Sequence, residues 1–285
     1  MRAEPTRDDR VLPLTRWVAL AIIPFLVVAF AVLYPFPGDT GRLFAWPVKP
    51  AITPMILGSV YLGGAYFFAR AATASHWHTV KGGFIPVGTF ATLMGVATIV
   101  HWDKFSHSRP AFWLWAGLYF TTPLLIFGIW WANRRHDDPA ADADLLLPAR
   151  VSRVIAVLGA LSVATAAFLF VFPGSAAAIW PWTLTPLTAR VMGAIFALGV
   201  AGLGAPADRR WASARILLQV AGVMLALIVI AGARASDELA PSNAMTWLIG
   251  AGFIAVLAAI ATLYARMRTR QPARNRTRRE RVMKA

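Results

Sequence analysis

Eight long apolar stretches constrain this chain more than any other feature of its sequence. Each is about 18–23 residues long, the length at which an α-helix crosses roughly 30 Å of hydrocarbon. They cover residues 15–34, 51–70, 83–101, 111–132, 152–172, 186–205, 212–233 and 245–266. Since backbone groups inside a bilayer must bond within their own segment, these stretches are predicted to be helices. With 58% hydrophobic and 14% charged residues, the sequence predicts an all-α polytopic membrane protein with eight transmembrane helices.

Positive charges are distributed unequally between the two sides of this predicted bundle. Of the 28 Lys and Arg, all but six fall on the side that carries both termini. The exceptions are Arg42, Lys49, Lys104, Arg109, Arg190 and Arg234. By the positive-inside rule, the chain is predicted to be a multi-pass protein of the cell membrane with both termini in the cytoplasm.

The two halves of the chain resemble each other at an offset of 134 to 136 residues. The segment FPGDTGRLFAWPVKP, 36–50, aligns with FPGSAAAIWPWTLTP, 172–186, and later matches such as Trp77 with Trp211 keep the same order. We therefore predict two tandem repeats of four helices, which are parallel because four is an even number. The predicted divisions are a cytoplasmic N-terminal tail 1–14, a first unit 15–135, a cytoplasmic linker 136–150, a second unit 151–266 and a basic cytoplasmic tail 267–285.

The formal net charge of +15 comes in large part from the C-terminal tail. The run RMRTRQPARNRTRRERVMK, 266–284, directly follows the last predicted helix. Polybasic segments in this position bind anionic lipid headgroups at about 1 kcal/mol per basic residue. Membrane lipids are therefore the predicted partner of the tail, and no nucleic acid is predicted. The chain has no cysteine, which excludes disulfides and thiolate metal sites, and no cofactor is specified.

The first half carries polar and helix-distorting residues that the second half lacks. Its histidines, counting the exit of the half, are His76, His78, His101, His107 and His136. Its apolar stretches contain Pro24, Pro54, Pro86 and Pro123. A proline inside a helix removes a backbone hydrogen bond and kinks the helix. The second unit is therefore expected to be regular, and any ligand site is expected in the first.

The segment HWDKFSHSRPAFWLW, 101–115, is the most polar predicted loop on the outer side. A histidine held by a carboxylate is common in metal sites, and an Asp–His pair can transfer protons. The spacing of His101, Asp103 and His107 fits no zinc motif, however. A solvated lip is favoured, a polar ligand or proton site is the alternative, and a bound metal is least favoured.

A second histidine group lies on the predicted inner side. His76 and His78 could ligate a metal through alternate residues, with or without His136. Polar residues are also expected at a membrane interface, and this interpretation is favoured. No metal site is therefore predicted.

Three classes of function remain open from the sequence. The leading prediction is that the protein binds or translocates a small neutral, apolar or lipid-like ligand through the first four-helix unit. The predicted ligand-binding residues are His101, Trp102, Asp103, His107, Tyr119, Thr121 and Thr122. The alternative is an accessory or assembly subunit whose partners are other membrane subunits. An intramembrane enzyme that uses the outer His/Asp cluster is least favoured, because no catalytic motif is present.

Overall fold

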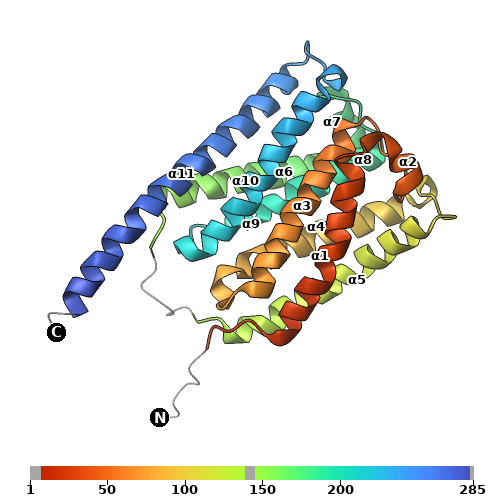
Figure 1. The fold of residues 1–285 in the computed structure, drawn as a ribbon. Coiled ribbons are helices and arrows are strands. Elements are labelled where there is room, and N and C mark those ends of the chain that lie inside the picture. Colours follow the sequence, from red (N-terminus) through yellow and green to blue (C-terminus); the bar gives the residue numbers. More distant parts are fainter. Residues whose placement is uncertain (1–7, 139–144, 283–285) are drawn as a thin grey trace.

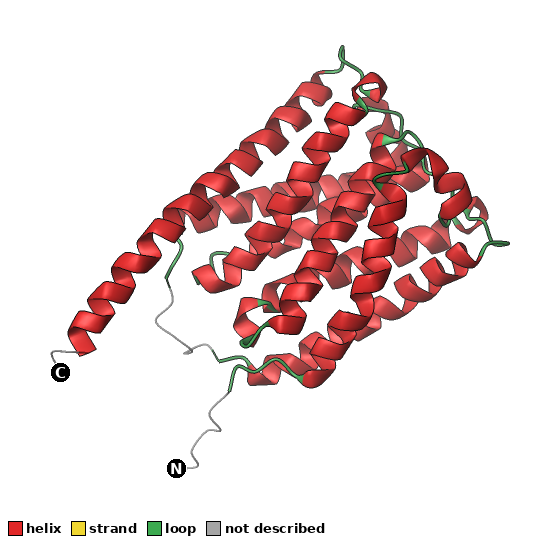
Figure 2. Cartoon of the chain, in the orientation of Figure 1, coloured by secondary structure: helices red, strands yellow, loops and turns green. Residues whose placement is uncertain are grey.

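A computed structural model of the protein describes residues 8–138 and 145–282, and it confirms the eight long helices. The fold is 80% helical, with no strand in the described ranges (Figure 2). The segments long and apolar enough to cross a membrane are Pro13–Leu33, Ile52–Thr73, Lys81–Val100, Pro110–His136, Ala149–Val171, Pro186–Leu203, Trp211–Arg234 and Ala244–Arg270. The chain is therefore a multi-pass membrane protein. Parts of the predicted tails and linker, 1–7, 139–144 and 283–285, lie outside the described residues.

Short helices and turns join the long ones at both ends. The α-helices are α1 Pro13–Leu33, α2 Thr40–Leu43, α3 Ile52–Thr73, α4 Phe84–Val100, α5 Pro110–Asn133, α6 Ala149–Val171, α7 Pro173–Ile179, α8 Pro186–Phe196, α9 Val200–Leu203, α10 Trp211–Arg234 and α11 Ala244–Val282. Proline occupies the first position of α1, α5, α7 and α8. It is well tolerated there, because the N–H it lacks would have no partner within the helix.

The long helices form two rows of four (Figure 1). One row has the order α1, α3, α10, α11, and the other has the order α5, α4, α8, α6. Each row thus combines two helices from each half of the chain. In the apolar 18-residue segment of α3, 78% of the residues are buried, whereas in that of α11 none is. The central helices therefore form the core, and the outer helices present apolar side chains to the surroundings, as lipid contact requires.

Polar contacts join the two halves at the end of the bundle opposite the termini, called here the opposite end. The Tyr34 hydroxyl donates to the Leu227 carbonyl over 2.8 Å, and the Arg234 guanidinium donates to the Tyr34 carbonyl over 3.1 Å. Glu238 accepts from the backbone N–H groups of Ala51 and Ile52, each over 2.8 Å. Its carboxylate thus lies at the N-terminus of α3, where the helix dipole favours negative charge.

Two backbone clasps close the end of the bundle that carries the termini, called here the terminal end. In the first clasp, the Trp77 N–H donates to the Asp9 carbonyl over 2.7 Å, beside a bridge between Arg10 and His76. In the second clasp, the Trp211 N–H donates to the Leu145 carbonyl over 2.7 Å, beside a bridge between Leu146 and Arg210. Each clasp ties the segment before a long helix, α1 or α6, to the loop before another, α4 or α10.

The prediction that all four prolines of the first half distort helices is wrong for two of them. Pro24 and Pro123 lie inside α1 and α5. Pro54 and Pro86 are the third residues of α3 and α4, where a helix has no internal partner for an N–H group. One turn before Pro123 in α5, the backbone of α4 comes close, since a Cβ on Gly95 would lie 3.0 Å from the Tyr119 carbonyl oxygen.

The expectation of a regular second half is also wrong. A 3₁₀ turn, Ala197–Gly199, separates α8 from α9 within the sixth membrane segment. The Ser162 hydroxyl of α6 donates to the Phe196 carbonyl over 2.6 Å at this break. A Cβ on Gly159 would lie 2.6 Å from the Gly199 carbonyl oxygen, so two glycines allow the backbones to touch. Close helix approach, rather than proline, accompanies this interruption.

Candidate functional site

An apolar cavity of about 1570 Å³ lies between the two rows of helices. Val60 of α3 and Met224 of α10 line it from one row, and Phe90 of α4 and Phe196 of α8 line it from the other. Pockets for drug-sized ligands commonly hold roughly 300–1,000 Å³, so this cavity has room for a larger apolar molecule. Both halves of the chain build it, whereas the sequence favoured a site in the first half alone.

Three hydroxyl groups of the cavity wall, on Tyr61, Tyr119 and Ser162, are already hydrogen-bonded within the protein. The Tyr61 and Tyr119 hydroxyls lie 2.7 Å apart in a buried hydrogen bond between α3 and α5. Ser162 uses its hydroxyl on the Phe196 carbonyl, as described above. Hydroxyls that are already bonded in this way do not oppose an apolar ligand beside them. The middle of the cavity is therefore suited to hydrocarbon.

Charged side chains border the cavity at the terminal end. Lys81, Arg150, Asp208 and Arg266 are among its lining residues. The Lys81 ammonium lies 2.8 Å from an Asp137 carboxylate oxygen and 3.7 Å from an Asp208 carboxylate oxygen. The cavity thus has an apolar middle and a charged rim, a profile that matches an amphipathic molecule.

The polar groups of His101 and Asp103 each pair with a residue outside the predicted ligand set. His101, at the end of α4, lies with its Nε2 2.7 Å from an Arg190 guanidinium nitrogen. Arginine can only donate, so this nitrogen accepts and the imidazole is neutral. Burial, with the Arg190 charge as the second cause, lowers the pKa of His101. Asp103 is exposed and pairs with Lys104 over 2.7 Å, and this hydrogen bond lowers the pKa of its carboxyl.

Trp102 and His107 form an aromatic stack instead of a ligand set. Their ring centroids are 5.1 Å apart, and the Phe112 ring meets His107 edge-on at 4.6 Å. His107 Nε2 is buried and has no hydrogen-bond partner among the described residues. The imidazole is therefore packed as a ring within an aromatic cluster.

The three predicted residues of α5 separate in the structure. Tyr119 and Thr122 line the cavity. Thr121 is exposed, and its hydroxyl donates back to the Gly117 carbonyl over 2.7 Å. Two of the seven predicted residues thus reach the cavity, and the five others are not among its described lining residues.

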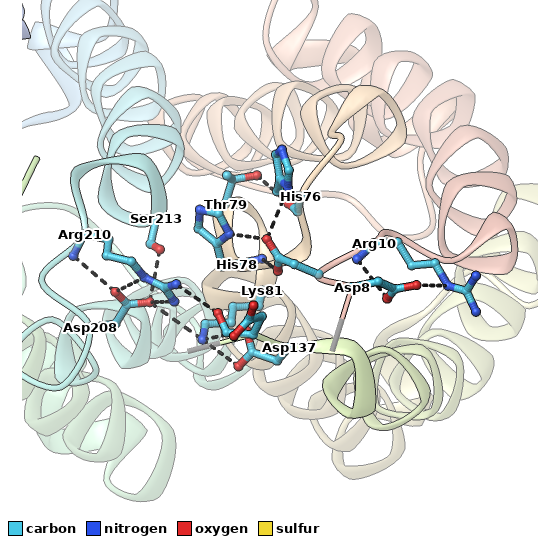
Figure 3. A network of polar contacts seen from close by, with 12 residues as sticks. Asp8, Arg10, His76, His78, Thr79, Lys81, Asp137, Asp208, Arg210 and Ser213 are labelled. Atoms are coloured by element: carbon cyan, nitrogen blue, oxygen red, sulfur yellow. Dashed lines mark hydrogen bonds and ion pairs between the residues drawn. The ribbon is translucent and has the colours of Figure 1, made fainter. Parts of the chain in front are cut away.

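A cluster of titratable side chains surrounds the first clasp at the terminal end (Figure 3). The Asp9 carboxylate is hydrogen-bonded to His78 Nδ1 and lies 3.3 Å from His76 Nδ1. The ligating atoms of these three residues all lie within 4.8 Å of one another, a spacing that could hold a metal ion. The sequence pointed to the two histidines but not to Asp9, because 67 residues separate it from the nearer one.

Two neighbouring networks complete this end of the molecule (Figure 3). His136 Nδ1 lies 3.0 Å from an Asp8 carboxylate oxygen, so the third inner histidine faces Asp8 and not the Asp9 cluster. Asp208 accepts from Arg210 over 2.9 Å and from Ser213 over 3.0 Å. Burial alone would raise the pKa of Asp208, but the hydrogen bonds and charge of Arg210 outweigh burial and lower it to about 2.

In comparisons with known proteins, no family model, no curated protein and no solved structure matches the chain.

Proposed function

We propose that this protein binds or translocates a small neutral, apolar or lipid-like ligand, and that the ligand occupies the cavity between the two rows of helices. The observation that supports this proposal most is the cavity itself, about 1570 Å³ with a largely apolar wall. An apolar molecule gains free energy by filling such a space in proportion to the apolar area it covers. Tyr119 and Thr122 remain in the proposed site, while the outer loop residues serve as its solvated lip.

Two glycines of α11 provide a matched pair for testing this site. Gly252 lines the cavity, and a Cβ there would meet nothing within 4 Å. Gly250 also has open space around a Cβ and is not among the described lining residues. Gly252→Phe should therefore fill part of the cavity, whereas Gly250→Phe adds the same ring to the same helix outside it.

The experiment measures retained and added ligand in parallel. The purified full chain is analysed by native mass spectrometry for co-purified apolar molecules and titrated with a pyrene-labelled long-chain alcohol in nanodiscs. We expect wild type and Gly250→Phe to bind the probe alike and Gly252→Phe to bind at least tenfold more weakly. Equal binding by all three proteins, with equal stability, would contradict the proposal.

We also propose that the fold consists of two parallel four-helix units, with the divisions given above. Paired contacts at the opposite end support this arrangement. Trp113 Nε1 donates to the His107 carbonyl over 2.9 Å, and Trp247 Nε1 donates to the Pro241 carbonyl over 3.0 Å. The two clasps form a second pair of like contacts. The rows also correspond: one contains the first and second long helices of the first unit and the third and fourth of the second unit, and the other row contains the reverse combination.

The basic tail is proposed to bind anionic lipid headgroups on the cytoplasmic side of a cell membrane, where both termini would lie. The helix α11 extends well beyond the predicted span that ends at 266, and the sequence after that point is rich in arginine. Positive charge next to a membrane helix favours both anionic lipid and a cytoplasmic position. An accessory role beside other membrane subunits stays a prediction that no particular contact favours.

A further inference from the structure

We propose that Asp9, His76 and His78 form a binding site for one divalent transition-metal ion of the zinc class at the terminal end of the bundle. This site is separate from the proposed apolar cavity, and it stands on different residues. It ties the segment before α1 to the loop between α3 and α4.

The three side chains offer ligating atoms to one point. Asp9 Oδ2 faces Nδ1 of both imidazoles, with His76 Nδ1 at 3.3 Å. Neighbouring ligands of a tetrahedral ion with bonds of about 2.0–2.1 Å lie roughly 3.3 Å apart. The rings of His76 and His78 are 5.7 Å apart between centroids. His78 Nδ1 and Asp9 Oδ2 are in direct hydrogen-bond contact, so a bound ion would take the place of that bond and move the two atoms apart.

The backbone holds this arrangement in place independently of any ion. Trp77, between the two histidines, is fully buried, and its ring packs against Phe84 at 4.9 Å. The His78 backbone N–H donates to Asp9 Oδ1 over 3.0 Å, which orients the carboxylate so that Oδ2 faces the two imidazoles. Asp9 has a positive φ of 50°, a conformation that aspartate tolerates better than most residues.

Burial distinguishes these ligands from ordinary surface groups. Asp9 is 3% exposed and His78 is 6% exposed. A carboxylate taken out of water requires compensation by positive charge or several hydrogen bonds. The His76 side chain is 59% exposed, so an ion can reach the cluster from the aqueous side.

The second clasp shows that the backbone contact does not require these side chains. It has the same Trp N–H to carbonyl bond, of 2.7 Å. The places of Asp9, His76 and His78 are taken there by Leu145, Arg210 and Ala212 at the repeat offset. None of these three side chains is a metal ligand of the usual kinds. The ligating groups of the first clasp are therefore additions to a scaffold that closes without them.

The ligand set indicates the class of metal. Two imidazoles and one carboxylate suit zinc, iron, nickel or copper, whereas calcium and magnesium prefer oxygen ligands alone. Three protein ligands also leave at least one coordination position for water or another small ligand. Zn²⁺ and its spectroscopic substitute Co²⁺ are the probes to use.

The test uses the full chain in detergent, purified through a tag without histidines and treated with a chelator. Zn²⁺ is titrated by calorimetry, metal content is measured after gel filtration, and Co²⁺ is followed by its visible spectrum. We expect one ion per chain in wild type. His76→Ala changes an exposed residue and should weaken Zn²⁺ binding at least tenfold without unfolding the protein. Asp9→Asn should also weaken Zn²⁺ binding at least tenfold. It should keep the fold, because the amide oxygen can still accept from the His78 backbone N–H.

Matched controls separate the site from nonspecific binding. Asp8→Asn and His136→Ala alter a neighbouring Asp–His pair at the same end, and both should retain wild-type affinity. A wild-type protein that binds no Zn²⁺ would show that Asp9 and His78 form only a structural hydrogen bond. Equal loss in the control variants, or unchanged affinity in His76→Ala and Asp9→Asn, would also overturn the proposal.

Discussion

The two clasps at the terminal end share a backbone and differ in their side chains. Both use a buried tryptophan whose N–H donates to a carbonyl over 2.7 Å. Around Trp77 the structure gathers a carboxylate and two imidazoles, and around Trp211 it gathers the Asp208–Arg210–Ser213 network. The two clasps thus have the same backbone contact and different titratable side chains around it.

The largest effect is expected from removing the tryptophan of each clasp. Trp77 is fully buried among Phe67, Phe84 and Ile216, so Trp77→Ala should cost about 3–5 kcal/mol of unfolding free energy. Trp211 belongs to a smaller cluster with Leu147 and Met267, and Trp211→Ala should cost less. Unfolding by sodium dodecyl sulfate in mixed micelles measures both. A larger loss of unfolding free energy for Trp211→Ala than for Trp77→Ala would contradict this prediction.

A somewhat smaller effect should come from metal bound at the first clasp. Zn²⁺ at 100 times the wild-type dissociation constant should stabilise wild type by about 2.7 kcal/mol and His76→Ala by no more than about 1.4 kcal/mol. The same unfolding assay, with and without Zn²⁺, reports the difference.

Moving the ligands sharpens this comparison further. Leu145→Asp, Arg210→His and Ala212→His together place the ligand set on the second clasp. We expect the triple variant to bind a second, weaker equivalent of Zn²⁺ by calorimetry. A stoichiometry that stays at one would show that the shared backbone alone does not position the ligands.

Asp208→Asn tests the network that replaces the metal ligands at the second clasp. The amide loses the ionic partners Arg210 and Lys81, so we expect a loss of about 1 kcal/mol at pH 7. Because the pKa of Asp208 is lowered from 3.8 to about 2 in the folded protein, its stabilisation is present above pH 4 and is lost as the pH falls towards 2. The stabilities of wild type and variant should converge over that window, and a constant difference would exclude the ionic contribution.

The smallest effect is expected in the outer loop. Asp103 is exposed and pairs only with its neighbour Lys104 among the described contacts. Asp103→Asn should change the unfolding free energy by less than about 0.5 kcal/mol and leave binding of the pyrene-labelled alcohol unchanged. Weaker binding of the pyrene-labelled alcohol by Asp103→Asn would show that the outer loop contributes to ligand binding.

Local sequence signals predicted the eight helices, whereas only two of the seven predicted ligand-binding residues line the cavity. The eight spans follow from apolar length alone, because each membrane helix satisfies its own backbone. Proline was a weaker guide, since Pro54 and Pro86 start helices while the break at Ala197–Gly199 contains no proline. That break has only glycines as its sequence signal, and glycines are also common in unbroken membrane helices.

The sequence by itself determined the number, length and approximate bounds of the membrane helices, because these depend on residues close together in the chain. The tertiary structure decided which helices share a row, where the cavity lies and which titratable groups meet. Asp9 lies beside His76 and His78 because α1 and α3, which follow and precede these segments, pack side by side. Such contacts depend on how whole helices fit together, and no local pattern of residues records that fit.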